Sequence, residues 1–441
     1  MIFNQKNNKM TAEIAILNRE AVAIAADSAA TFNDGTNQKI FSSANKIFAL
    51  SKHQPIGIMI YGNALFMGIP WETIIKVYRR KLGDTKCNTL YEYSQNFIEF
   101  LNGNSKLFPE KEQEKHVKSN IFGFFYEMKK EIIESMNEKI EKKGNINRLE
   151  ILKATDIFIT ETLKKWEKGL CNISEADKRL VEIQEKYKVI INDTIIEVFE
   201  KLPLSAKARN LLKEIASYLF ISFPDGIKNN GISGVVISGF GDEEIFPSLV
   251  AFSIEGMANN ILKYKEDQYK KVDYEKSAMI FPFAQKEMVV TFIEGISPLF
   301  EKMYYDLLRE TVENYPEVII ENVAPDLKKK PKEKLLKNIQ KVSLDNLNKG
   351  LERVNEIQQE HFINPILKVV TFLPKNELAE MAESLVNLTC LRKKISMDEE
   401  TVGGPIDVAV ISKGDGLIWI KRKHYFNLEL NKQFFVNYID K

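Results

Sequence analysis

Residues 11–26 read TAEIAILNREAVAIAA, and Asp27 follows them directly. Two apolar runs stand on either side of a polar break at residues 18–20. Short apolar runs that contain β-branched side chains and are bounded by polar residues are typical of buried strands. We therefore predict a β-hairpin whose first strand begins at Thr11 and whose second strand ends at Asp27.

Further apolar patterns predict more strands and several helices. A loop with the turn sequence Asn-Asp-Gly is predicted over residues 31–36. Strands are predicted over 45–50, 56–61, 234–241, 246–254, 406–411 and 417–420. Helices are predicted from residue 64 onward and over 286–310, 335–359 and 375–391, where apolar residues recur at helical spacing.

The order of these features resembles the start of a proteasome β-subunit or of a bacterial proteasome-like peptidase. The shared features are a threonine at the strand start, Ala-Asp-Ser, Asn-Lys before apolar residues, and a strand followed by Gly-x-Ala. The resemblance implies an N-terminal-nucleophile hydrolase with an α+β fold. The expected architecture is an αββα four-layer sandwich, in which two antiparallel sheets lie between helical layers, with large helical insertions in this chain.

The resemblance also implies roles for individual residues. Thr11 falls at the family's nucleophile, Asp27 at its aspartate, and Lys46 at its buried lysine. Gly62 falls at the glycine whose backbone amide binds the oxyanion, and Ala29 stands where the family usually has arginine.

A closing segment near residue 400 resembles the family's Asp-x-x-Ser-Gly-Gly motif. Gly403 and Gly404 match its two glycines. Glu399, or Asp398 with a slip of one residue, takes the place of the acid, and Val402 replaces the serine. In the family this acid and serine hold the amine of the nucleophile, so the valine removes one hydroxyl from that arrangement.

The chemistry explains why these residue types belong together. A threonine hydroxyl is a weak nucleophile until a base takes its proton, and an N-terminal threonine can use its own α-amine, whose reference pKa is about 7.7–8.0. The Lys46 cation would lower the pKa of that amine, and Asp27 would orient Lys46. A donor such as the Gly62 amide is worth roughly 3–4 kcal/mol where an oxyanion develops.

A free amine at Thr11 requires that nothing precedes it, and here Met10 does. Translation starts at Met10, or residues 1–10 are a short propeptide that self-cleavage removes. This segment is polar and does not have the apolar core of a signal peptide.

Composition excludes several other classes of protein. The chain has 441 residues and a net charge of +1, so charge does not favour a nucleic-acid or membrane partner. Its three cysteines and four histidines show no metal-ligand spacing, and a glycine-rich phosphate loop is absent, so neither a metal nor a cofactor is expected. The sparse cysteines indicate a reducing, cytoplasmic setting.

The resemblance covers about half of the chain and leads to a domain prediction. We expect 1–10 as the propeptide or misassigned start, 11–100, 225–312 and 372–441 as the three parts of the hydrolase core, and 101–224 and 313–371 as helical insertions.

The leading prediction is a threonine-type peptidase that hydrolyses peptide bonds with Thr11. The expected partners are a peptide or unfolded-protein substrate, further copies of the chain in a homo-oligomer, and an unfoldase. Two alternatives stay open: an amidohydrolase of small amides, and a non-catalytic scaffold or sensor.

Overall fold

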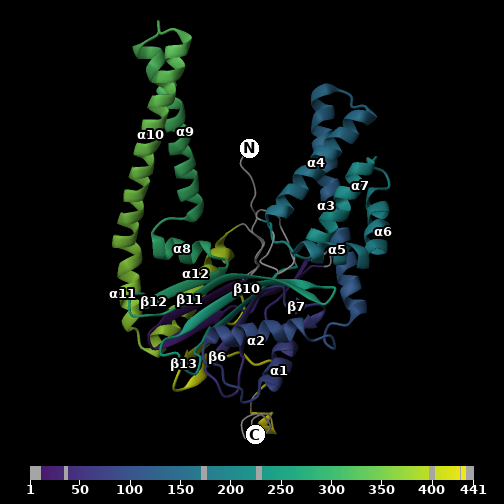
Figure 1. Cartoon of the computed structure of the whole chain (residues 1–441). Coiled ribbons are helices and arrows are strands. Elements are labelled where there is room, and N and C mark those ends of the chain that lie inside the picture. Colours follow the sequence, from purple (N-terminus) through teal and green to yellow (C-terminus); the bar gives the residue numbers. More distant parts are fainter. Residues whose placement is uncertain are drawn as a thin grey trace. The chain divides into compact units, whose positions relative to one another are not determined.

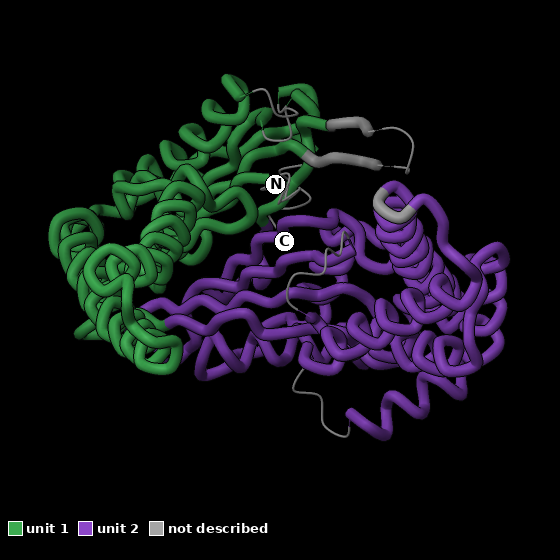
Figure 2. The backbone as a smooth tube through the Cα atoms, turned by 90° about the horizontal axis from the view of Figure 1, so that it is seen from above, with its two compact units in different colours: residues 1–47, 271–441 green, residues 48–270 purple. Residues whose placement is uncertain are grey.

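The computed structural model describes residues 11–33, 38–169, 176–224, 231–396, 403–427 and 429–433. The chain divides into two compact units, Met1–Ile47 with Lys271–Lys441 (unit 1) and Phe48–Lys270 (unit 2), which Figure 2 shows in different colours. Each unit combines helices with one five-stranded sheet, so the fold is mixed α+β. The predicted stacking of the two sheets in a four-layer sandwich stays a prediction.

The sheet of unit 1 is built around the predicted hairpin. Its strands are β1 (Ala12–Asn18), β2 (Ala21–Ala26), β12 (Ala278–Ala284), β13 (Asp407–Ser412) and β14 (Gly416–Lys421), in the order β12-β1-β2-β13-β14. All four pairings are antiparallel. The side chain of Asn18 closes the hairpin by accepting hydrogen bonds from the backbone amides of Glu20 and Ala21. The hairpin prediction is therefore confirmed.

The helices of unit 1 follow β12 along the chain. They are α8 (Glu287–Glu294), α9 (Pro298–Val323), α10 (Lys329–Gln358), the π-helix η1 (Gln359–Ile363), α11 (Asn364–Phe372) and α12 (Lys375–Ile395). Helices α9 and α10 run side by side as a long hairpin (Figure 1). Helix α12, which the sequence predicts over 375–391, packs a face that includes Ala379 and Ala382 against β1 and β2.

Three predictions in unit 1 need correction. The helix expected over 286–310 is two helices, because Gly295 has a positive φ of 75° and caps α8 before Pro298 begins α9. The helix expected over 335–359 begins earlier, at Lys329. The region expected as a loop over 31–36 holds part of an antiparallel pair, β3 (Ala30–Asn33) with β4 (Gln38–Phe41), and its turn residues lie outside the described ranges.

The sheet of unit 2 has the order β11-β10-β9-β6-β5. These strands are β5 (Ile47–Ala49), β6 (Ile56–Gly62), β9 (Ser233–Gly239), β10 (Ser248–Ala258) and β11 (Ile261–Lys271). The sequence prediction missed β11, because the strand is rich in charged residues and half-solvated. The sequence signal that could have revealed β11 is the pair Asn259-Asn260 just before it, because asparagine is common in tight hairpin turns. In the structure the two residues have positive φ values of 53° and 58°, as such a turn requires.

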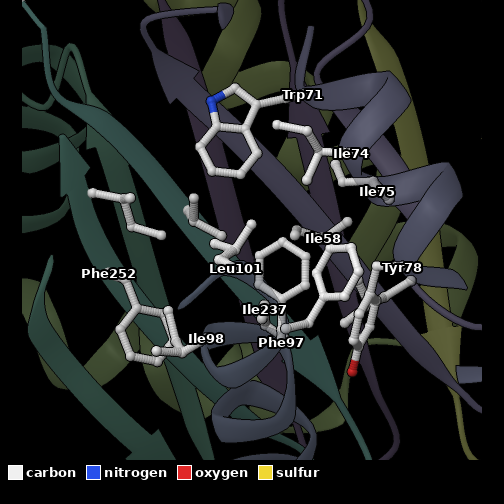
Figure 3. Packing of buried hydrophobic residues seen from close by; sticks show 14 of the residues in the cluster. Ile58, Trp71, Ile74, Ile75, Tyr78, Phe97, Ile98, Leu101, Ile237 and Phe252 are labelled. Carbon is white, nitrogen blue, oxygen red and sulfur yellow. The ribbon is translucent and has the colours of Figure 1, made fainter. Parts of the chain in front are cut away.

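The helices of unit 2 form two groups. Helices α1 (Trp71–Leu82) and α2 (Leu90–Asn102) pack on the sheet, and Figure 3 shows Trp71, Phe97 and Ile237 within their shared core. Helices α3 (Glu110–Lys143), α4 (Arg148–Lys168), α5 (Ala176–Lys186), α6 (Lys188–Phe199) and α7 (Ala206–Tyr218) share a second core.

The helix predicted from residue 64 begins later than expected. Residues 65–70 form a small hairpin, β7 (Leu65–Phe66) with β8 (Ile69–Pro70), and α1 starts only at Trp71. Met67 and Gly68 occupy the turn with φ values of 51° and 80°. Two successive residues with positive φ cannot continue a right-handed helix, so this turn delays its start.

Candidate active site

Thr11 stands immediately before β1, where it continues the pairing of β1 with β12. Its carbonyl oxygen accepts a hydrogen bond from the backbone amide of Gln285 at 3.1 Å. The hydroxyl donates to Glu13 Oε2 at 2.9 Å, and the residue is only 4% exposed. The hydroxyl thus has a fixed direction and a carboxylate as its acceptor.

Asp27 lies just beyond the end of β2 and is fully buried. Its Oδ1 accepts from the Ala12 amide at 3.0 Å and from Lys46 Nζ at 2.5 Å. Its Oδ2 accepts from the amides of Ala29 at 3.2 Å and Gly403 at 2.9 Å. Four donors match the roughly four acceptor positions of a carboxylate. Asp27 is therefore an anchor that holds neighbouring backbone and Lys46 in place.

Lys46 precedes β5 and reaches the same cluster, with 6% of the residue exposed. Its ammonium lies between two carboxylates, 2.5 Å from Asp27 Oδ1 and 3.2 Å from Glu13 Oε1. Both carboxylate side chains are fully buried, so the three groups form a desolvated ion cluster. Thr11, Asp27 and Lys46, which the sequence resemblance selects, are thus brought together within unit 1.

Glu13 is the member of this cluster that the sequence prediction missed. It is 2% exposed and joins the Thr11 hydroxyl to the Lys46 ammonium. Burial raises the pKa of its carboxyl from 4.5 to about 7, the positive charge of Lys46 opposes the rise, and the negative charge of Asp27 adds to it. The sequence signal that could have revealed Glu13 is its position as the one charged residue in an apolar run. It lies two residues from Thr11, which places both side chains on the same face of the strand.

The segment from Gly403 to Pro405 closes over Asp27. Ser28 donates its backbone amide to the Gly403 carbonyl at 3.1 Å and its hydroxyl to the Pro405 carbonyl. Gly404 has a φ of 79°, and a Cβ there would lie 2.8 Å from the Ser42 carbonyl oxygen. The two glycines that match the family motif thus lie beside the cluster. Glu399, Asp398 and Val402 lie outside the described residues.

Gly62 ends β6 in unit 2, where it faces Ser233 of β9. Its φ is 80°, and a Cβ would approach the Ile232 carbonyl oxygen to 2.6 Å. The position therefore needs glycine for both its conformation and its close backbone contact. The role of its amide as an oxyanion donor stays a prediction.

Cys390 of α12 lies near the cluster and is buried. Burial raises the pKa of its thiol to about 12, and the charges of Asp27 and Glu13 add to the rise. A thiol in this state is neutral near pH 7, so it is a packing group rather than a nucleophile.

A cavity of about 720 Å³ lies elsewhere, among helices of unit 2. Its lining includes one hydroxyl residue, Ser205, which caps α7 through the Ala208 amide and donates to Asp156 at 2.7 Å. That hydroxyl is engaged in holding the helix start. The cluster around Thr11 is therefore the better candidate for chemistry.

Within the described ranges, no group of three or more His, Cys, Asp or Glu residues is arranged to hold a metal ion. The helices of those ranges also include none with the length and apolar character needed to cross a bilayer.

Comparison with known proteins adds little beyond this geometry. No protein-family model matches the chain, and no curated protein matches it. Among solved structures, it is similar to Anbu (ancestral beta-subunit) from Yersinia bercovieri, with 11% identity and a TM-score of 0.26 over 97% of this chain and 94% of that chain. A TM-score this low carries no argument about function.

Proposed function

We propose that the chain is a threonine-type hydrolase of peptide bonds in which the Thr11 hydroxyl is the nucleophile. The observation that carries the proposal is the buried cluster of Thr11, Glu13, Asp27 and Lys46. The sequence resemblance to proteasome-like peptidases selects three of these four residues independently of the geometry. A nucleophilic hydroxyl hydrogen-bonded to a basic group, which a further group holds in place, is the arrangement that activates a hydroxyl for acyl transfer.

Lys46 has an electrostatic role in this proposal. Its ammonium lies beside the Glu13 carboxylate that accepts the Thr11 hydroxyl, so it places a positive charge near the reacting oxygen. Negative charge on that oxygen during attack would be stabilised in a site from which water is excluded. Asp27 would hold the ammonium, and the Gly62 amide is the proposed oxyanion donor. Glu399 keeps its proposed role of holding the amine.

The proposed substrate is a peptide or an unfolded protein, because the resemblance is to peptidases. The proposed chemistry uses the Thr11 hydroxyl, the charged side chains beside it and backbone amides. We also propose that copies of the chain assemble into a homo-oligomer and act together with an unfoldase.

A peptidyl β-lactone tests the nucleophile directly. The lactone acylates an activated hydroxyl, and intact mass followed by tandem mass spectrometry of the fragments locates the adduct. We expect the adduct on Thr11, its loss in Thr11→Ala, and its retention in Thr11→Ser. Thr311→Ala, which removes the same atoms from an exposed position of α9, is the matched control. Undiminished acylation of Thr11→Ala would contradict the proposal. If the protein hydrolyses small amides but not peptides in a separate turnover assay, it is an amidohydrolase instead of a peptidase.

A further inference from the structure

Any use of the Thr11 hydroxyl needs a group that accepts its proton. The α-amine of a threonine can do so only when it is free. In this sequence Met10 precedes Thr11, and a peptide nitrogen is a donor and no base. The reaction that would first free the amine, cleavage of the bond before Thr11, therefore needs a different base.

The geometry of the cluster distinguishes among the candidate bases. Asp27 already accepts from four donors, so its lone pairs are committed. An ammonium such as that of Lys46 has donors and no acceptor. The neutral Cys390 thiol is a weak acceptor. Glu13 remains, and its Oε2 is the atom that accepts the Thr11 hydroxyl at 2.9 Å.

We propose that Glu13 is the general base that takes the proton of the Thr11 hydroxyl, and that it does so while a peptide bond still precedes Thr11. The inference rests on the proposed function and names the residue that activates its nucleophile. Glu13 would be a catalytic residue in the strict sense, because it contacts the reacting oxygen atom.

The proposed step balances without any additional reagent. The Thr11 proton moves to Glu13 Oε2 as Thr11 Oγ1 forms a bond to the substrate carbonyl carbon. The carbon–nitrogen bond then breaks, and the proton on Glu13 passes to the leaving nitrogen. Water, deprotonated by Glu13, hydrolyses the ester and restores the hydroxyl. The same base serves whether the carbonyl belongs to a separate peptide or to the residue that precedes Thr11.

The surroundings of Glu13 suit this role near neutral pH. A carboxyl with a pKa of about 7 is half ionised at pH 7 and is a stronger base than an ordinary glutamate. The groups that face it are the Thr11 hydroxyl on its own strand, Asp27 beyond β2, Lys46 before β5, and Cys390 of α12. The positive charge of Lys394, also on α12, acts on the Cys390 thiol and lowers its pKa.

The cost of burying a carboxylate at residue 13 also supports a functional role. A carboxylate in a dry site costs folding free energy, and Asp27 alone already pairs with Lys46. A neutral side chain of similar size at residue 13 would avoid this penalty. A buried group that costs stability and has a strongly shifted pKa is characteristic of functional sites.

The test uses two forms of the chain with each substitution. One form is the full chain, and the other begins at Thr11 after release from a fusion partner. Each is made as wild type, Glu13→Gln, Thr11→Ala and the control Glu20→Gln, whose carboxylate lies in the exposed turn of the same hairpin. Intact mass reports cleavage before Thr11, and the peptidyl β-lactone reports acylation over pH 5 to 9. Circular dichroism and a melting curve verify that each variant is folded.

We expect the wild-type full chain to be acylated, or to cleave before Thr11, with a rate that rises with pH around a midpoint near 7. Glu13→Gln should slow both reactions by at least about 100-fold, the usual scale of a general base. Glu20→Gln should behave as wild type. In the form that begins at Thr11, a smaller loss is expected because the free amine can substitute for the carboxylate.

Two results would overturn the inference while leaving the proposed function intact. One is Glu13→Gln reacting at the wild-type rate in both forms while Thr11→Ala is inert. The other combines two observations. The full chain neither cleaves before Thr11 nor is acylated, and in the form that begins at Thr11 the wild type and Glu13→Gln are equally reactive. In contrast, reaction of Thr11→Ala at the wild-type rate, or an inert wild type in both forms, would remove the proposed function itself.

Discussion

Lys46 Nζ lies 2.5 Å from Asp27 Oδ1, and both residues are buried. The pair joins the end of β2 to the segment before β5 and places a cation beside Glu13. One ammonium therefore compensates two carboxylates that have almost no access to solvent. The consequences of this imbalance can be measured through stability as well as activity.

Replacing Lys46 by methionine should be strongly destabilising. The substitution leaves the stem volume largely unchanged but deprives Asp27 and Glu13 of their cation, and breaking a buried pair costs about 3–5 kcal/mol. The loss should be larger at pH 8 than at pH 5, because Glu13 can neutralise itself by binding a proton at the lower pH. Urea unfolding at the two pH values measures it.

The matched control is Lys375→Met. Lys375 pairs with Asp415 at 2.7 Å in an exposed position of unit 1, where a surface ion pair contributes at most about 1 kcal/mol. Equal losses for the two lysine variants would contradict the assignment of a buried cluster. We also expect Lys46→Met to slow acylation of Thr11, since the positive charge next to the reacting groups is lost.

Glu13→Gln should stabilise the protein at high pH. The folded carboxyl has a pKa of about 7 against 4.5 for the reference, so between these values the folded state binds the proton more tightly than the unfolded state does. The contribution of Glu13 to the free energy of unfolding is therefore full below pH 4.5 and declines as pH rises to about 7. A pKa rise from 4.5 to about 7, at 1.36 kcal/mol per unit, corresponds to a decline of roughly 3–4 kcal/mol.

The glutamine variant should remove this decline. Its gain over wild type should grow between pH 5 and pH 8, and Glu20→Gln should show no comparable trend. A melting series over that range is sufficient. If the free energy of unfolding changes with pH in the same way for the wild type and for Glu13→Gln, then Glu13 is not the buried titrating group.

Gly62→Ala should cost more stability than Gly68→Ala. Both glycines have a φ of 80°, so each substitution incurs the left-handed penalty of about 1–2 kcal/mol. At Gly62 the new Cβ would also lie 2.6 Å from the Ile232 carbonyl oxygen, whereas nothing lies within 4 Å at Gly68. We expect a further loss of roughly 1–3 kcal/mol from this overlap, read from the unfolding midpoints. Equal losses would refute the close contact of β6 with β9.

Cys390 should resist alkylation in the folded protein. With a thiol pKa of about 12, its thiolate fraction at pH 8 is about three orders of magnitude below that of a free cysteine, whose pKa is near 8.5. Iodoacetamide labelling followed by peptide mass spectrometry should find Cys390 modified slowly in the native chain and rapidly in urea. Fast native labelling would show that the environment assigned to α12 near the cluster is wrong.

The hairpin of β1 and β2 could be predicted from sequence because its information is local. Two short apolar runs and a polar break select strands, and Asn18 supplies the turn with its own side chain. Strand alternation also places Thr11 and Glu13 on one face, so Glu13 could have been included. Strand β11 was missed because its many charged residues hide the apolar alternation of a strand. The break at Gly295 was missed because the apolar residues on either side of this single glycine continue at helical spacing.

The chemistry of the cluster depends on contacts that no local pattern determines. The Gly403 amide reaches Asp27 across 376 residues of sequence, and Lys46 arrives between two carboxylates from outside the sheet of unit 1. Such contacts form only when distant segments pack and exclude water. That exclusion raises the pKa of Glu13 and makes a glutamate of ordinary sequence context a base near pH 7. Sequence determined which residues were available, and tertiary burial decided their charge states and their partners.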